Sequence, residues 1–315
     1  MPEKTVIDPA LAPFIAAFEA ALGEPAHMIE PARFRALAAS LSPLKPETRP
    51  ADVSVSDHVL AANDRAIGMR LYRPQGESPL PALLYFHGGG WMIGSVDTYD
   101  AITAEIASRS GCLVVSVDYA LAPEHPYPAA IQDALAAWEW LAGNAEALEI
   151  DPARIAVGGD SAGGQIAASL CLWLRDSHGE QPFALQWLIY PALDTDFERR
   201  SQVAQARAPI LPAATLRWFW AHYLQELVGD PPVYAVPLRT SDFHALPPAV
   251  ISVAGFDPLH DEGCAFAAAL TEAGVEVTLI EEPTLVHGHL RMRTVSPVAQ
   301  AAFARACTAL RLGLE

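Results

Sequence analysis

Two glycine-rich blocks of the chain carry the residue types that acyl transfer needs. The first block is His87-Gly88-Gly89-Gly90-Trp91, and the second is Gly159-Asp160-Ser161-Ala162-Gly163-Gly164. The second block fits the pattern G-x-S-x-G, a tight turn between a strand and a helix that lifts a serine hydroxyl clear of the backbone. The first block fits a loop whose backbone N–H groups turn toward a negatively charged oxygen. Together they predict a reaction in which Ser161 attacks an acyl group.

The serine needs a base, because a hydroxyl is a weak nucleophile until its proton is removed. In sites built on this turn, the acid and the histidine follow the serine in the chain. Six histidines follow Ser161, but only His287 and His289 lie in a loop directly after a late predicted strand. His287 precedes Gly288, which lets the loop turn tightly beside the serine. We therefore predict His287 as the general base, with His289 as its rival or as a second polar group at the pocket mouth.

The histidine in turn needs a carboxylate that fixes its tautomer. Asp257 follows the predicted strand at residues 249–254 within a short turn, which places it at the same sheet edge as His287. Asp261 and Glu262 are predicted to open the next helix, where acidic side chains suit the helix dipole. Asp257 is therefore favoured over these two and over the remaining aspartates considered, Asp194, Asp196, Asp230 and Asp242.

The oxyanion is expected to bind to backbone N–H groups of the two blocks. Gly89, Gly90 and Ala162 are the predicted donors, and Gly88 is the alternative. His87 is interpreted as an anchor of the loop. The candidates for lining the substrate pocket are Trp91, Asp160, Trp218, Phe219 and His289. Ordinary core packing is the alternative for the aromatic rings. Asp160 either helps to orient the loop or is a polar residue near the mouth, and it is given no catalytic role.

Strands and helices alternate from residue 51 onward. Strands are predicted at residues 53–60, 67–73, 82–86, 112–118, 154–158, 184–190, 249–254 and 275–280. Helices are predicted at residues 97–109, 129–141, 162–174 and 297–312. This alternation, with continuous apolar strands, indicates an α/β fold with a mostly parallel sheet covered on both faces. Each chemical block follows a strand, as expected for a site at the carboxyl ends of parallel strands.

Two segments interrupt this pattern. Residues 1–50 contain two short predicted helices, at residues 9–22 and 31–41, followed by several prolines. Residues 193–245 contain a helix at residues 212–224 that carries four aromatic side chains. We interpret 1–50 and 193–245 as two parts of a cap over the active-site mouth, and 51–192 with 246–315 as the catalytic domain.

Composition narrows the function classes. Apolar residues make up 51% of the 315 residues and charged residues 18%, which argues against disorder. The net charge of −17 and the lack of a basic patch argue against nucleic-acid binding. The four cysteines are widely spaced, so core thiols are expected and no metal site is predicted. We see neither a convincing signal peptide nor a membrane-spanning run, and expect a cytoplasmic protein.

These residues resemble the hormone-sensitive-lipase-like carboxylesterases, the bacterial family IV esterases of the α/β-hydrolase superfamily. The resemblance rests on the two glycine blocks and on four further motifs: Asp118-Tyr119-Ala120-Leu121-Ala122-Pro123-Glu124, Tyr190-Pro191, Asp257-Pro258-Leu259 and His287-Gly288. It implies an eight-stranded α/β-hydrolase fold with a helical cap. It also implies cofactor-free hydrolysis of short- to medium-chain acyl esters by Ser161, Asp257 and His287. A homodimer is a further possibility that this reading leaves open.

The chain departs from the family pattern at two positions. Ala120 replaces the usual arginine, which predicts that an ion pair with Asp118 or Glu124 is missing. His289 replaces the usual aromatic residue, which predicts a change in pocket polarity or pH profile. Neither change removes a member of the predicted triad. The same triad also serves amidases, deacetylases and acyltransferases, and a non-catalytic ligand-binding protein is the reading from a different class.

Overall fold

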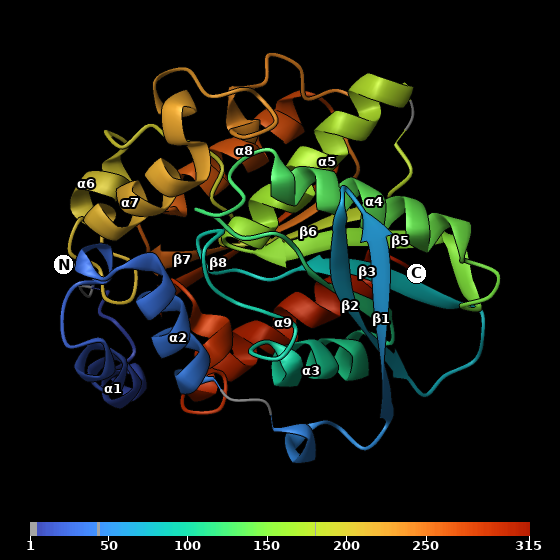
Figure 1. Cartoon of the computed structure of the whole chain (residues 1–315), viewed down its shortest axis with the longest axis horizontal. Helices are drawn as coiled ribbons and strands as arrows, with labels where there is room; N and C mark the ends of the chain where they lie inside the picture. Colours follow the sequence, from blue (N-terminus) through green and yellow to red (C-terminus); the bar gives the residue numbers. More distant parts are fainter. Residues whose placement is uncertain (1–4, 43–44, 180) are drawn as a thin grey trace.

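The core of the fold is one eight-stranded sheet (Figure 1). The structure is a computed structural model that describes residues 5–42, 45–179 and 181–315. The strands lie in the order β1-β2-β4-β3-β5-β6-β7-β8. They are β1 (Val53–Ala62), β2 (Arg65–Pro74), β3 (Leu80–Phe86), β4 (Leu113–Asp118), β5 (Ile150–Asp160), β6 (Leu185–Ile189), β7 (Ala249–Phe256) and β8 (Val277–Val286).

The sheet is antiparallel at one end and parallel elsewhere. β1 alternates between more and less exposed side chains and pairs with β2 in antiparallel fashion. β2 is also antiparallel to β4, whereas all the other neighbours in the sheet are parallel. Every side chain of β6 is buried, as expected for a parallel strand covered on both faces. The predicted mostly parallel eight-stranded sheet is confirmed.

Two layers of helices cover the sheet. On one face lie α3 (Asp100–Ser110) and α9 (Pro297–Leu312), which contact each other. The opposite face is covered by α4 (Ala129–Gly143), α5 (Ala162–His178) and α8 (His260–Glu272) (Figure 1). Because both faces bury apolar side chains, the sheet is held rigidly and the loops at its carboxyl edge have a fixed support.

The two segments that interrupt the alternation pack on each other. Residues 5–50 form α1 (Ala12–Leu22) and α2 (Pro31–Leu41), and residues 193–245 form α6 (Arg200–Ala204) and α7 (Ala213–Leu224). The Phe34 ring of α2 lies 5.8 Å from the Trp218 ring and 6.0 Å from the Phe219 ring of α7. Short 3₁₀ helices complete the described elements: η1 (Pro9–Leu11), η2 (Ala26–Met28), η3 (Pro46–Thr48), η4 (Gln225–Gly229), η5 (Pro237–Arg239) and η6 (His289–Met292).

The cysteines are free thiols, as expected. Cys112, Cys171 and Cys307 are buried, and Cys264 is partly buried. Burial raises the pKa of the Cys112 thiol to about 11, which keeps it protonated at neutral pH. Within the part of the chain that the structure describes, none of the helices has the length and apolar character needed to span a membrane.

The expectation that Glu124 lacks an ion pair is wrong. Arg35 on α2 reaches the loop after β4 and pairs with the Glu124 carboxylate, Nη2 to Oε2 at 2.7 Å. The same guanidinium donates from Nε to the Met92 carbonyl at 2.8 Å and from Nη2 to the Ala122 carbonyl at 3.0 Å. The arginine absent at position 120 is thus replaced by one from a distant helix, which ties α2 to the body of the fold.

We expect the substitution Glu124→Gln to lower stability in a pH-dependent way. Arg35 lowers the pKa of Glu124 from 4.5 to about 2 in the folded protein. This pair therefore stabilises the fold above about pH 4.5, and its contribution is lost as the pH falls toward about 2. Because half of the Glu124 side chain is exposed, solvent screening limits the cost at pH 7 to about 1 kcal/mol or less.

Urea unfolding of the wild type and the variant at pH 7, 5, 4 and 3 tests this expectation. The difference in free energy of unfolding should shrink steadily below pH 4.5. Glu19→Gln, an exposed glutamate on α1 for which no ion partner is described, is the control. A difference that is the same at every pH would contradict the assignment.

Candidate active site

Ser161 lies on the turn between β5 and α5. Its backbone has φ +55° and ψ −118°, a region that residues other than glycine rarely occupy. The Ser161 N–H donates to the Ile189 carbonyl of β6 at 2.9 Å, which holds the turn against the sheet. A Cβ atom on Gly163 would lie 1.9 Å from the Phe86 carbonyl oxygen, so only glycine fits there. The motif is therefore a strained elbow that presents the hydroxyl at the start of a helix.

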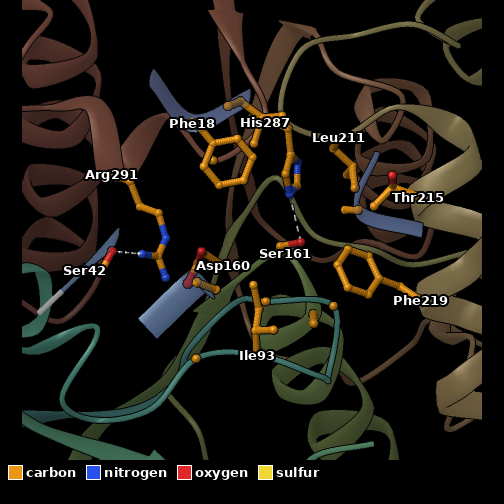
Figure 2. A pocket seen from close by; sticks show the side chains of 18 of the residues that line it. Phe18, Ser42, Ile93, Asp160, Ser161, Leu211, Thr215, Phe219, His287 and Arg291 are labelled. Carbon is orange, nitrogen blue, oxygen red and sulfur yellow. Dashed lines mark hydrogen bonds between the residues drawn. The ribbon is translucent and has the colours of Figure 1, made fainter. Parts of the chain in front are cut away.

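The structure brings Ser161, His287 and Asp257 into one hydrogen-bonded chain. His287 Nε2 lies 2.9 Å from Ser161 Oγ (Figure 2). On its other side, His287 Nδ1 lies 2.7 Å from Asp257 Oδ2. Asp257 is fully buried, and its Oδ1 accepts the Leu259 N–H at 2.9 Å. A buried carboxylate that accepts from Nδ1 leaves Nε2 free to take the serine proton. The arrangement can therefore generate a serine alkoxide for nucleophilic attack.

Sheet topology explains why these distant residues meet. Ser161 directly follows β5, Asp257 follows β7, and His287 follows β8. β7 and β8 are parallel neighbours, with Phe256 paired to Val286 at their carboxyl ends. The glycine block follows β3, which pairs directly with β5. Four strands thus deliver the predicted residues to one edge of the sheet, as expected for parallel sheets.

The rival residues have other partners. His289 is buried beside Tyr190, whose ring lies 4.7 Å from the His287 ring and 4.9 Å from the His289 ring. His289 Nδ1 lies 3.3 Å from the Val286 carbonyl, and burial lowers the pKa of His289 to about 4. Asp261 accepts the Ser201 N–H, as expected of a residue near a helix start rather than at the serine.

Three backbone N–H groups beside the serine are available to an oxyanion. Within residues 5–42, 45–179 and 181–315, no acceptor is found for the N–H groups of Gly89, Gly90 and Ala162. The Gly88 N–H instead donates to Asp160 Oδ1 at 2.8 Å, so the alternative donor is already engaged. Gly90 has φ +59°, and a Cβ there would lie 2.3 Å from the Phe219 ring. The loop is therefore held between the sheet and α7.

Asp160 organises this loop, which is one of the two roles that the sequence left open for it. Its two oxygens accept the Gly88 N–H and three tyrosine hydroxyls, from Tyr85 at 2.7 Å, Tyr99 at 2.9 Å and Tyr190 at 3.4 Å. Asp160 is 3% exposed. A buried carboxylate that satisfies four donors fixes the position of each. It thereby connects the glycine block to the turn that carries Ser161.

We expect Asp160→Asn to reduce kcat while leaving KM nearly constant. An amide has one acceptor oxygen, and its NH₂ group would face the two donors that one carboxylate oxygen now accepts from, either Gly88 and Tyr85 or Tyr99 and Tyr190. The Gly88 segment should then shift, which weakens oxyanion binding by its neighbours and lowers kcat by about 10- to 100-fold. Unfolding should become easier by about 1–3 kcal/mol because a buried donor loses its acceptor.

Steady-state kinetics and urea unfolding measure these two effects separately. Asp151→Asn is a matched control, since Asp151 is another β5 aspartate, far from the serine in the strand and paired with Arg154. Equal kcat values for the Asp160 variant and the wild type would contradict the positioning role.

A cavity of about 310 Å³ opens beside Ser161 and His287. Its walls come from α1 and α2, from the glycine block, and from α7 and the loop before it (Figure 2). Most lining side chains are apolar, among them Phe14, Phe18, Phe34, Leu41, Ile93, Ile210, Leu211, Leu216, Phe219 and Met292. Such a cavity suits an apolar acyl or alcohol group.

The predicted pocket residues divide into two groups. Trp91, Asp160 and Phe219 line the cavity, whereas Trp218 and His289 are not among its described lining residues. Trp218 packs edge-on against Phe34 instead. Trp91 is also a packing residue, since its ring stacks on Tyr223 at 4.4 Å and its Nε1–H donates to Gln165 at 2.8 Å. Trp91 therefore both lines the cavity and packs in the core.

Sequence reasoning missed Arg291 and Ser42, which also line the cavity. Arg291 lies four residues after His287 on the same loop, and this spacing is the one signal that could have drawn attention to it. Ser42 follows α2, and its approach to this loop depends on how the N-terminal helices pack.

Comparison with known proteins agrees with this geometry. Residues 83–291 match a family model described as alpha/beta hydrolase fold. The chain is 40% identical to the esterase LipI of Mycobacterium tuberculosis over 99% of this chain and 97% of that protein. It is 43% identical to the carboxylesterase NlhH of the same species over 79% of each chain.

A thermostable esterase from Pseudomonas putida ECU1011 has a similar solved structure. It superimposes with a TM-score of 0.90 at 31% identity, covering 100% of this chain and 99% of that one. The chain thus belongs to the α/β-hydrolase family, in its hormone-sensitive-lipase-like branch.

Proposed function

We propose that the protein is a serine carboxylesterase that hydrolyses short- to medium-chain acyl esters through an acyl-enzyme. The observation that carries this proposal is the chain from Ser161 Oγ to His287 to the buried Asp257 carboxylate, with distances of 2.9 and 2.7 Å. The N–H groups of Gly89, Gly90 and Ala162 beside it support the same chemistry. The carboxylesterase and esterase relatives agree with it.

Acylation begins when His287 Nε2 takes the Ser161 proton and Oγ attacks the ester carbonyl carbon. The carbonyl oxygen becomes an oxyanion, which accepts hydrogen bonds from the three N–H groups. As the carbonyl reforms, the bond to the alcohol oxygen breaks, and His287 gives its proton to the leaving alkoxide. Asp257 stays ionised throughout and stabilises the imidazolium.

Deacylation repeats these steps with water as the nucleophile. His287 takes a proton from water, and the hydroxide oxygen attacks the carbonyl carbon of the acyl-enzyme. The Ser161 Oγ–carbon bond then breaks, and His287 returns the proton to Oγ. The products are the carboxylic acid and the alcohol, and no cofactor enters the balance.

The helices over the site are proposed to act as a cap, with 51–192 and 246–315 as the catalytic domain. Phe14 and Phe18 of α1, Phe34 of α2 and Phe219 of α7 all line the cavity. Elements from residues 1–50 and 193–245 therefore cover the serine from two sides. A cavity of about 310 Å³ is small for a long acyl chain, which supports short to medium substrates.

Hydrolysis of p-nitrophenyl esters from acetate to laurate tests the proposal. We expect kcat/KM to be highest for short or medium chains and to fall toward laurate. The matching p-nitroanilides and an added alcohol acceptor test the amidase and acyltransferase alternatives. A folded protein that hydrolyses none of the esters would contradict the proposed function, and faster anilide turnover would replace it with an amidase.

A further inference from the structure

Arg291 brings a positive charge into a cavity whose lining side chains are mostly apolar. It belongs to η6 (His289–Met292), directly beyond the loop that carries His287. Among the described residues that line the cavity, it is the only lysine or arginine. A guanidinium in such a place costs desolvation energy unless a partner compensates it. Its position therefore needs an explanation beyond packing.

Two neighbours hold the guanidinium in place. Arg291 Nη1 donates to Ser42 Oγ at 2.7 Å, and the guanidinium carbon lies 4.5 Å above the centre of the Tyr99 ring. Figure 2 shows Arg291 and Ser42 on one side of the cavity and Leu211 and Thr215 on the other, with Ser161 and His287 between them. The charge is thus oriented, and Arg291 lines the same cavity as Ser161, with Asp160 between them in this view.

Among the described residues, no carboxylate contacts the guanidinium directly. In the described ranges of the chain, Arg291 has no acidic side chain within 4.0 Å. Burial alone would lower the pKa of Arg291, but Tyr99 and the Asp160 carboxylate, which lies nearby in Figure 2, raise it above its ordinary value. Asp160 therefore compensates part of the charge from a distance, while its oxygens accept from Gly88 and three tyrosines. Apart from the Tyr99 contact, Ser42 is the one side-chain hydrogen-bond partner found for the guanidinium in these ranges, which leaves N–H groups for a ligand. Two of them can bind a carboxylate in parallel.

A second cavity meets the first at this position. It has a volume of about 700 Å³ and shares Leu41, Ser42, Thr98 and Arg291 with the cavity at Ser161. Arg291 therefore stands at the boundary between an apolar space and a wider, more polar one. A charged group bound to Arg291 can keep part of its hydration while the ester lies in the apolar space, which reduces the cost of desolvation.

We propose that Arg291, positioned by Ser42, makes the enzyme selective for esters that carry a carboxylate a few bonds from the scissile carbonyl. Monoesters of short dicarboxylic acids place this group on the acyl side, and acyl esters of short hydroxy acids place it on the alcohol side. This inference rests on the proposed esterase function and names its substrate class. The net charge of −17 repels anions at long range, so the preference depends on this local contact.

Two matched substrate pairs test the selectivity. The acyl-side pair is the p-nitrophenyl monoester of glutaric acid and p-nitrophenyl 4-carbamoylbutanoate, its neutral amide analogue. The alcohol-side pair is 4-acetoxybutanoate and 4-acetoxybutanamide. The measured quantity is the ratio of kcat/KM for the charged substrate to that for its neutral analogue. We expect this ratio to exceed about 10 for at least one pair, because the bond to the carboxylate is charge-assisted.

Variants separate recognition from a structural role. Arg291→Met should lower the ratio by about 10-fold or more, and Arg291→Lys should restore part of it because the charge returns. Ser42→Ala should lower the ratio less, since the guanidinium stays but loses its anchor. Arg109→Met is the matched control, because Arg109 lines the second cavity but is not among the described residues lining the first. It should leave the ratio unchanged.

A wild-type ratio of one or less in both pairs would overturn the inference. So would an equal loss on charged and neutral substrates in Arg291→Met, because that is what a structural role predicts. If folded wild-type protein, checked by circular dichroism, hydrolyses none of the four esters, the proposed esterase function itself fails. The two failures are therefore distinguishable. If Arg291→Met does not fold, the ratios of Arg291→Lys and Ser42→Ala decide.

Discussion

Ser161→Ala should abolish ester hydrolysis, lowering kcat by on the order of 10⁶-fold. Alanine has no side-chain oxygen, so no acyl-enzyme can form at this position. His287 and the oxyanion donors remain, but the nucleophile is absent. Removing a nucleophile costs about as much as removing a whole triad, because the three residues act as a unit. The residual rate should come from substrate binding and oxyanion stabilisation with water as the nucleophile.

The fold should tolerate this change. Ser161 has φ +55°, and alanine at this position carries the same backbone strain as serine. The substitution therefore neither adds to the strain of the turn nor relieves it. The side chain loses its bond to His287, but Ser161 is 8% exposed and water can replace the partner of Nε2. We expect the free energy of unfolding to change by less than about 1 kcal/mol.

Ser116→Ala is a suitable control for this experiment. Ser116 is fully buried on β4, and its hydroxyl has no hydrogen-bond partner among the described residues. It is not among the described lining residues of the cavity, so its removal should leave kcat unchanged. Hydrolysis by the Ser161 variant at one hundredth of the wild-type rate or more would show that another group is the nucleophile. The p-nitrophenyl acetate assay distinguishes these outcomes directly.

The sequence placed Ser161, Asp257 and His287 at one edge of the sheet because each of them follows a strand. A strand with a continuous apolar pattern must lie inside a covered parallel sheet, and such sheets collect their functional loops at one edge. Short motifs with strict steric needs, such as Gly163 against the Phe86 carbonyl, then mark the position of the turn. Local pattern and overall topology are therefore sufficient to predict that Ser161, Asp257 and His287 lie together.

Strand ends were harder to predict where polar residues are paired. β8 extends to Val286, whereas the apolar pattern ends at residue 280. The extension contains Glu282 and Pro283, which normally argue against a strand. Glu282 is nevertheless buried, because Arg305 on α9 binds it at 2.6 Å. The pairing between residues 23 positions apart cannot be read from a local window, and β8 is an edge strand that tolerates proline.

Side-chain partners far apart in the chain could not be predicted from the sequence for the same reason. The Arg35–Glu124 pair joins residues 89 positions apart, and the Arg291–Ser42 bond joins residues 249 positions apart. Both depend on how α2 packs against the body of the fold. Neither a motif nor a periodic pattern contains this information. Pocket lining by Trp218 and His289 was predicted from residue type alone, and the structure gives both residues other neighbours.

The second large effect is expected from Asp257→Asn, which should lower kcat by on the order of 10⁴-fold. Asp257 Oδ1 accepts the Leu259 N–H at 2.9 Å, and Oδ2 lies 2.7 Å from His287 Nδ1. In the variant, the amide oxygen should take the place of Oδ1, because the Leu259 N–H needs an acceptor. The amide NH₂ group then faces His287 Nδ1 and donates to it.

This reversal changes the tautomer of His287. With Nδ1 accepting a hydrogen bond, the proton of the neutral ring must sit on Nε2, which points at Ser161 Oγ at 2.9 Å. An Nε2–H cannot accept the serine proton, so the geometry stays intact while the base is lost. We therefore expect kcat to fall with little change in KM. Labelling of Ser161 by an organophosphonate should slow to a similar degree, because it needs the same proton transfer.

Asp261→Asn is the matched control, since Asp261 lies four residues further along and pairs with His260 at 3.0 Å rather than with His287. It should retain wild-type kcat. A loss of less than tenfold in Asp257→Asn would mean that another group fixes the His287 tautomer. Glu262, which is buried nearby on α8, is the residue to test next, although the Leu193 N–H already occupies its Oε1 at 2.6 Å. Because that oxygen is engaged, the geometry favours Asp257 as the group that orients the base.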